Sequence, residues 1–223
     1  MAPESSTPTS SRTEALYKQL RSAIISCRLP PNKRLKISDL AEYYIVSPGA
    51  VREALSRLTS ENLVVSETHR GFKVSPISNT DLEDLTNVRI DIETQCLRRS
   101  ISNASIEWES ALVAASHTLN KIAEQASSER RHVSDEWAEA HQAFHSALVA
   151  ACDSVWLLRI RKDLYAQSER YRRLSVPLDS GDRDITREHD LILEASLARD
   201  ADKAAKLLAE HMRRTTFIIL DGN

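Results

Sequence analysis

Four histidines in the later part of the chain have spacings and surroundings that could produce a metal-binding group. His141 and His145 are four residues apart, which places both imidazoles on one face of a helix, close enough to bind one ion. His189 and His211 lie in two later segments, and each is bordered by apolar residues. Neutral imidazoles suit zinc, nickel, copper or iron better than calcium or magnesium. The same spacing more often belongs to hydrogen-bonded core or surface histidines, so spacing alone leaves both interpretations open.

The segment from His141 to His145 also has the outline of the H-E-x-x-H motif of metal-dependent hydrolases, but it lacks the catalytic base. The second position of that motif supplies the base, and here it is Gln142, which cannot accept a proton in that role. With only four glycines, the chain cannot form a Gly-rich phosphate-binding loop of the G-x-G-x-x-G or Walker type. The protein is therefore not expected to be an enzyme, and a metal-dependent hydrolase is the least favoured alternative.

A second group of residues, in the first third of the chain, has the pattern of a DNA-binding surface. Apolar spacing predicts three helices, the third capped by Ser47 and begun by Pro48. Two short apolar runs follow, joined by a polar turn that contains Arg70 and Gly71, which predicts a hairpin. Three helices and a hairpin make a winged helix-turn-helix.

The exposed face of the third helix could read DNA. The end of the helix that carries Ser47 and Arg52 could enter the major groove, where an arginine can bind guanine through two hydrogen bonds. Gly49 and Ser56 also lie away from the apolar positions of this helix. The turn at Arg70 and Gly71 suits the minor groove, because a glycine permits close approach. The alternative is a winged helix that binds another protein.

Composition and charge describe a globular chain whose two parts differ. Hydrophobic residues make up 41% and charged residues 28% of the 223 positions, and no apolar stretch approaches the ~18 residues of a membrane span. The three cysteines are widely spaced and odd in number, which favours a reducing, intracellular compartment over a disulfide framework. Residues 14–76 carry 10 Lys/Arg against 6 Asp/Glu, and residues 77–223 carry 19 against 25. This asymmetry indicates that the two parts have different partners.

The predicted fold class is mostly α, with a winged helix-turn-helix followed by an all-helical domain. The predicted parts are a flexible tail over residues 1–13, a winged helix over 14–76, a linker over 77–80 and a helical domain over 81–220. Six of the seven prolines occur at or before Pro76, so few helix breakers follow. Six helices are expected in the last part, over 81–102, 105–127, 130–151, 154–175, 182–198 and 200–219.

Several short segments of the first part match a known pattern. They are Leu40-Ala41-Glu42, Val46-Ser47, Val51 to Leu58, Leu63-Val64 and Arg70 to Val74. On these segments the first part resembles the DNA-binding domain of the GntR family of bacterial transcription regulators. The resemblance implies that Arg52 reads the major groove and that Arg70 with Gly71 forms the wing contact. It also implies a DNA-backbone contact for Arg34. Many members have Arg-Thr directly after the capping serine, where this chain has Pro48-Gly49, so one base contact is missing.

The later part has landmarks of its own, which are Val88-Arg89 with Glu93, Phe144-His145 with Leu148, Glu188-His189 with Ala195, and Glu210-His211. By these it resembles the FCD ligand-binding domain of FadR-type GntR regulators. In metal-binding members the ligands are three histidines and an aspartate four residues before the first. The resemblance therefore implies that His145, His189 and His211 are ligands and that His141 replaces the aspartate. Among the divalent transition metals, an imidazole in place of a hard oxygen favours zinc or nickel over manganese. Alternatively His141 does not bind, which leaves positions for water or effector.

The segment Glu136-Trp137 with His141 to His145 resembles the carbon-starvation and glutarate-responsive repressors of this branch. That resemblance implies a small carboxylate effector at or beside the metal. Arg89 matches a position that commonly faces the cavity and could bind a carboxylate through two hydrogen bonds. It could instead form an i,i+4 pair with Glu93, worth about 0.2–0.5 kcal/mol. Arg170 and Tyr171 are further candidates for effector binding, and Tyr171 is also a candidate core residue.

The expected function is a ligand-responsive DNA-binding transcription regulator, a repressor in particular, of the bacterial cytoplasm and associated with the nucleoid when bound to DNA. A homodimer is expected, because one winged helix makes few phosphate contacts and a palindromic operator presents two half-sites. The alternative is a metal-stabilised dimeric DNA-binding protein without a small-molecule effector.

Overall fold

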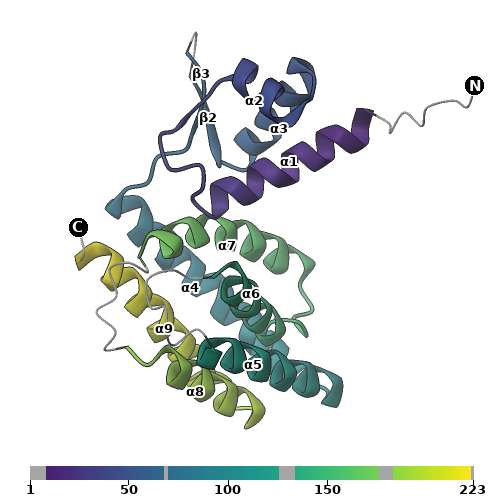
Figure 1. Ribbon diagram of the computed structural model, residues 1–223. Helices are drawn as coiled ribbons and strands as arrows, with labels where there is room; N and C mark the ends of the chain where they lie inside the picture. The colour runs from purple at the N-terminus through teal and green to yellow at the C-terminus, as the bar shows by residue number, and fades with distance from the viewer. Residues whose placement is uncertain (1–8, 68–69, 126–133, 176–182, 222–223) are drawn as a thin grey trace, which may run out of the picture. The chain divides into compact units, whose positions relative to one another are not determined.

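The computed structural model describes residues 9–67, 70–125, 134–175 and 183–221. The chain divides into two compact units, Met1–Ser78 and Asn79–Asn223. Both are built mainly of helices, which confirms the predicted fold class (Figure 1). None of the helices in the described part of the chain combines the length and apolar character that crossing a membrane requires.

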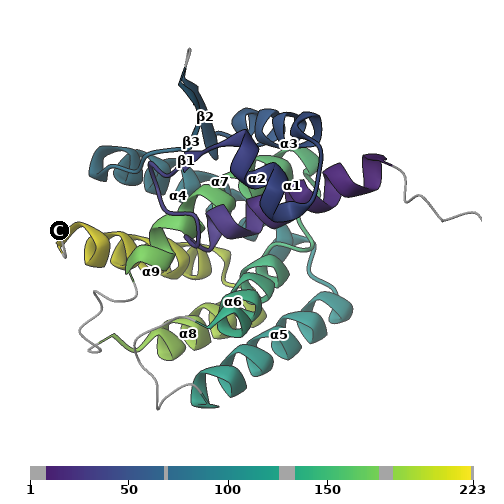
Figure 2. The ribbon, with the colours of Figure 1, turned by 45° about the horizontal axis from the view of Figure 1, so that its top comes forward.

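The first unit is a winged helix-turn-helix (Figures 1 and 2). Its elements are α1 (Thr9–Ile25), β1 (Arg34–Leu35), α2 (Ile37–Tyr44), α3 (Pro48–Ser60), β2 (Val64–Glu67) and β3 (Gly71–Val74). Strand β3 lies between β1 and β2 and pairs antiparallel with both. The core lies between α1, α3 and the sheet, and its largest fully buried side chains are Leu20, Ile24, Leu55, Leu58 and Leu63. Burial of these side chains stabilises the unit and holds α3 in place.

Helix α3 begins as its sequence predicts. The Ser47 hydroxyl accepts a hydrogen bond from the backbone N–H of Ala50 at 3.2 Å, and Pro48 occupies the first helical position. Val51, Ala54, Leu55 and Leu58 are fully buried. Because these residues occupy one side of α3, its opposite side is left for solvent or a partner.

The tail, the linker and one short strand differ from the sequence analysis. Helix α1 begins at Thr9, so the segment from 9 to 13 that was expected to be flexible tail is helical, and Thr13 is buried. Helix α4 begins at Asn79, so the last two residues of the expected linker are helical as well. Strand β1 was not predicted, because two residues are too short to display strand alternation. Residues 1–8 of the expected tail lie outside the described part.

The turn between α2 and α3 places a β-branched residue in a left-handed conformation. Ile45 has φ 53° and ψ 52°, and its side chain is 86% exposed. Such a conformation costs an ordinary L-residue about 1–2 kcal/mol, and glycine avoids the cost. The exposed side chain supplies little packing to offset it.

We expect Ile45→Gly to stabilise the protein by about 0.5–1 kcal/mol, because relief of the left-handed conformation exceeds the added entropy of the unfolded chain. Urea unfolding followed by circular dichroism measures the change. Ile45→Ala is the matched control, since it removes the exposed side chain but keeps a Cβ atom at positive φ. A glycine variant no more stable than the alanine variant would contradict this explanation.

The second unit is a bundle of six helices among the described residues. They are α4 (Asn79–Ser102), α5 (Ile106–Gln125), α6 (Asp135–Leu148), α7 (Val155–Ser175), α8 (Ile185–Leu197) and α9 (Ala201–Asp221). Helix α4 packs against α7 and α9, α5 packs against α6 and α8, and α8 packs against α9. Leu97, Leu112, Phe144, Ile192 and Leu208 are among the fully buried side chains of the core. The bundle therefore brings α6, α8 and α9 around one interior.

The starts of the helices follow their capping residues. The side chains of Ser105, Ser154 and Asp200 each accept a hydrogen bond from a backbone N–H three residues later. Helix α6 starts later than expected, because Ser134 caps it by accepting from the N–H of Trp137 at 3.0 Å. Residues 126–127, 130–133 and 182, also expected to be helical, lie outside the described part.

Candidate functional site

The four histidines meet in the second unit although they belong to three helices. His141 and His145 lie one turn apart on α6. His189 comes from α8 and His211 from α9. Their ring atoms that could bind an ion all lie within 4.8 Å of one another, and all four side chains are buried. These four residues are called the histidine cluster below.

The imidazoles of the cluster are held in the neutral form, which is the form that binds metals. Burial lowers the pKa of His141, His145 and His189 well below the ordinary value, and nearby imidazoles and arginines lower it further. The pKa of His211 is also lowered, because burial outweighs a hydrogen bond to Glu188 that would raise it. Each ring therefore has an uncharged nitrogen with a lone pair.

Three buried nitrogen atoms of the cluster have no hydrogen-bond partner within the described residues. They are Nδ1 of His141, Nε2 of His145 and Nε2 of His189. An unsatisfied buried polar atom costs about 1–3 kcal/mol, which a bound cation would remove. A donor set made only of imidazole nitrogens suits zinc or nickel. The residues present thus fit a divalent transition metal.

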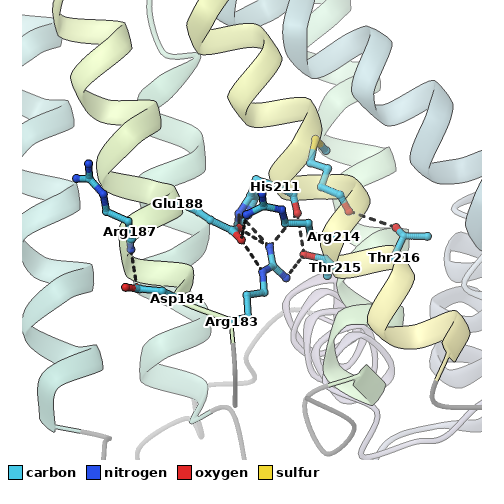
Figure 3. A network of polar contacts seen from close by, with 9 residues as sticks. Arg183, Asp184, Arg187, Glu188, His211, Arg214, Thr215 and Thr216 are labelled. Carbon is cyan, nitrogen blue, oxygen red and sulfur yellow. Dashed lines mark hydrogen bonds and ion pairs between the residues drawn. The ribbon is translucent and has the colours of Figure 1, made fainter. Parts of the chain in front are cut away.

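The fourth histidine, His211, differs from the other three because its Nδ1 atom is hydrogen-bonded to the carboxylate of Glu188 (Figure 3). The Nδ1 atom of His211 lies 2.8 Å from Oε2 of Glu188. Glu188 also accepts hydrogen bonds from Arg183 and Arg214. Burial alone would raise the pKa of Glu188, but the hydrogen bonds from His211 and the two arginines lower it below the ordinary range. Glu188 is therefore an ionised, buried hydrogen-bond acceptor.

Aromatic rings pack around the cluster and restrict its movement. Trp137 stacks on His141 with ring centroids 4.7 Å apart, and the guanidinium of Arg172 lies 5.1 Å from the Trp137 centroid. Phe144 is fully buried, with its centroid 5.0 Å from that of His189. These contacts hold the imidazoles in place before any ligand arrives.

A cavity of about 40 Å³ lies beside the cluster in the second unit. His141, His145 and His211 form part of its wall. The other polar residues of the wall are Thr86, Arg89, Ser168, Tyr171, Arg172, Thr215 and Thr216. The volume is room for a few water molecules or a small polar group. The wall thus combines two arginines with several hydroxyls and three imidazoles, and each arginine is also paired with a carboxylate, Arg89 with Glu93 and Arg172 with Glu169.

Arg89 lies in the cavity wall and also forms the i,i+4 pair with Glu93. Its Nη2 pairs with Oε1 of Glu93 at 3.2 Å, and its Nη1 donates to the Ser168 hydroxyl at 2.6 Å. Its guanidinium also lies 4.9 Å from the Tyr165 ring centroid. Glu93 is shared with Arg161, whose Nε donates to Oε2 at 2.6 Å. Arg89 is therefore a fixed cation in the cavity wall.

The other two effector candidates have different positions. Tyr171 lines the cavity, is 3% exposed and donates a hydrogen bond to Asp81. Arg170 is buried and donates to Gln167, and it is not among the residues that line this cavity. Arg172 and Ser168 line the cavity and were missed. Ser168 lies three residues before Tyr171, so helical periodicity from Tyr171 could have identified it. Arg172 directly follows Tyr171 and is not on the same helix face, so periodicity from Tyr171 gives no signal for it.

The predicted DNA-binding residues of the first unit are all exposed. On α3 and at its start they are Ser47, Gly49, Arg52 and Ser56, and in the sheet region they are Arg34, Arg70 and Gly71. Gly71 has φ +84°, which explains a glycine at the start of β3. Residues 68–69 of the turn lie outside the described part. Arg34 lies opposite Lys73 on the neighbouring strand, so the sheet presents two cations side by side.

Comparison with known proteins assigns both units. Residues 12–74 match the family described as bacterial regulatory proteins, gntR family, and residues 84–214 match the FCD domain. The HTH-type transcriptional regulator BphR of Paraburkholderia xenovorans is 39% identical over 92% of this chain and 84% of its own length. The HTH-type transcriptional repressor GlaR of Escherichia coli is 34% identical over 88% of this chain and 90% of its own length.

The fold agrees with solved structures. The E. coli protein McbR/YncC has a TM-score of 0.78 at 21% identity, covering 94% of this chain and 97% of its own. The family and the relatives are transcription regulators, which confirms that the chain is not an enzyme. The chain belongs to the GntR family of DNA-binding transcription regulators and carries the FCD domain after its winged helix.

Proposed function

We propose that this regulator is a homodimeric repressor whose FCD domain binds one divalent transition metal and a small carboxylate effector. The observation that carries the proposal is the convergence of four buried imidazoles, three of which line a cavity. We further propose that it acts in the bacterial cytoplasm, associated with the nucleoid while bound to a palindromic operator. The name of GlaR as a repressor supports the direction of regulation.

The metal ligands proposed are His141, His145, His189 and His211. An all-imidazole set favours zinc, or nickel, over manganese, and a bound ion would supply a positive centre for an anionic effector. Three of the four histidines line the cavity, so the ion would face it. His141, which replaces the family's aspartate, is fixed by its stack on Trp137.

The carboxylate class is supported by the charged and hydroxyl side chains that line the cavity. Arg89 and Arg172 contribute two cations to the cavity wall. The wall also has four serine and threonine hydroxyls in addition to the hydroxyl of Tyr171. Arginine binds carboxylates through paired, charge-assisted hydrogen bonds. We propose that Arg89 binds the effector carboxylate and that Arg172 and Ser168 assist, whereas Arg170, outside the cavity wall, has no direct role.

The effector must favour one arrangement of the two DNA-binding heads of a dimer. A preference of about 1–3 kcal/mol is the usual coupling between two sites and would lower operator affinity roughly 5–150-fold. A homodimer supplies the two DNA-binding heads, because an operator with two-fold symmetry needs two winged helices.

The test combines a thermal-shift screen of C3–C6 carboxylic acids with a mobility-shift assay on DNA from upstream of the protein's own gene. We expect at least one acid to raise the melting temperature of the metal-loaded protein and to release the DNA. If every acid leaves both unchanged while metal is bound, the domain is a metal-stabilised dimerisation unit. If no specific DNA affinity appears at moderate salt, the regulator proposal fails.

We expect Arg89→Ala to weaken binding of that acid about 10–100-fold, because a charged hydrogen-bonded pair worth about 1.5–3 kcal/mol is lost. Glu93 keeps its partner Arg161, so the bundle should remain folded. Isothermal titration measures the affinity. The matched control is Arg98→Ala, an exposed arginine of the same helix paired with Asp202. Equal affinities in the two variants would exclude Arg89 from the effector site.

A further inference from the structure

A buried carboxylate lies directly behind one member of the histidine cluster. Glu188 precedes His189 on α8, and its Oε2 lies 2.8 Å from Nδ1 of His211 on α9. Its side chain is 10% exposed. Glu188 is not a member of the histidine cluster. Its contact with His211 joins α8 to α9 beside the cluster (Figure 3).

This contact determines which nitrogen of His211 carries the proton. Both oxygens of Glu188 accept hydrogen bonds from arginines, which can only donate, so in the contact with His211 the carboxylate accepts and Nδ1 carries the hydrogen. In a neutral imidazole the other nitrogen, Nε2, then has the lone pair. Nη2 of Arg183 lies farther from Nδ1, at 3.3 Å, and has nearer acceptors in Glu188 and the His211 carbonyl. The arginine contact therefore does not reverse the assignment.

The carboxylate is itself held in one orientation by arginines. Arg183 donates to both oxygens of Glu188, from Nε at 3.0 Å and from Nη2 at 2.6 Å. The same guanidinium donates to the backbone carbonyl of His211 at 2.9 Å and to the Thr215 hydroxyl at 2.9 Å. Arg214 donates to Oε1 at 2.9 Å. The bidentate contact of Arg183 fixes the plane of the Glu188 carboxylate, which a point charge such as a lysine ammonium would not do.

We infer that Glu188 is a positioning residue for the metal site: it keeps Nδ1 of His211 protonated and directs Nε2 to the ion, while Arg183 fixes the carboxylate. Hydrogen bonds of this kind behind a metal ligand orient the ring and raise its basicity, and their loss typically costs 10–100-fold in metal affinity. The inference rests on the metal part of the proposed function. Neither Glu188 nor Arg183 is among the proposed metal ligands.

The test uses the full-length protein and zinc, with affinity measured by competition against a chromogenic chelator. We expect Glu188→Gln to bind zinc about 10–100-fold more weakly than the wild type. The control is Glu194→Gln on the same helix, where an exposed carboxylate pairs with Arg187 at 3.3 Å. We expect the control to bind zinc as the wild type does. A Glu188→Gln protein with wild-type zinc affinity would overturn the inference, even if its apo-form melts at a lower temperature.

A second measurement needs no variant and so does not depend on Glu188→Gln folding. Two-dimensional ¹H–¹⁵N NMR of the zinc-loaded wild type reports which nitrogen of each imidazole is protonated. We expect His211 to carry its proton on Nδ1 and to bind zinc through Nε2. Zinc bound through Nδ1 of His211 would overturn the inference while leaving the metal proposal intact. A wild type that binds no zinc or nickel would instead reject the metal proposal, and the positioning role with it.

Discussion

Replacing His189 with alanine is expected to reduce metal affinity roughly 100–1000-fold. Structural zinc sites contribute about 10–16 kcal/mol, and an equal share for each of four ligands is about 2.5–4 kcal/mol. His189 is 1% exposed, and its Nε2 has no hydrogen-bond partner among the described residues, so this atom is poised to bind an ion. Elemental analysis after dialysis against a weak chelator measures the loss as metal per chain.

The same variant should also respond less to the carboxylate effector, because the cavity beside the cluster would lose its positive centre. We expect size-exclusion chromatography to show an unchanged oligomer, since His189 is one side chain in an otherwise intact core. His117→Ala, which removes an exposed histidine of α5, is the control and should keep the full metal content. Wild-type metal content in the His189 variant would remove this residue from the ligand set.

Replacing Arg52 with alanine is expected to cost about 1–3 kcal/mol of specific DNA binding and to relax sequence choice at one operator position. Arg52 is exposed on α3, whose opposite side is buried against the core of the first unit. Selection of DNA fragments from a random library, followed by anisotropy titrations, measures both the affinity and the preference.

Arg34→Ala provides the comparison for Arg52. Arg34 lies in β1 and is proposed to contact the DNA backbone, so its loss should weaken binding of all sequences similarly and reduce the salt slope by about 1. If the two variants behave alike, with no change in sequence preference for Arg52→Ala, the assignment of α3 to the major groove is wrong.

The fold was largely accessible from the sequence because its helices have clear caps and periodic apolar positions. Ser47 and Pro48 define the start of α3, and Ser105 and Ser154 define the starts of α5 and α7. The short strand β1 and the left-handed Ile45 escaped prediction for physical reasons. Two residues give no alternation, and isoleucine is not a residue that signals positive φ.

The histidine cluster was only partly accessible from spacing. A separation of four residues places His141 and His145 on one helix face, but it says nothing about α8 and α9, whose packing determines where His189 and His211 lie. The family resemblance supplied that step. The role of Glu188 could not be read from the sequence, because its partner His211 is 23 residues away on another helix.

The most direct test of the account is the metal content and ligand environment of the purified wild-type protein. Elemental analysis combined with X-ray absorption spectroscopy gives both. We expect one zinc or nickel ion per chain, surrounded by imidazole nitrogens, at about 2.0–2.1 Å if the ion is zinc. A protein that remains metal-free after incubation with either ion, or an ion coordinated mainly by oxygen or sulfur, would contradict it.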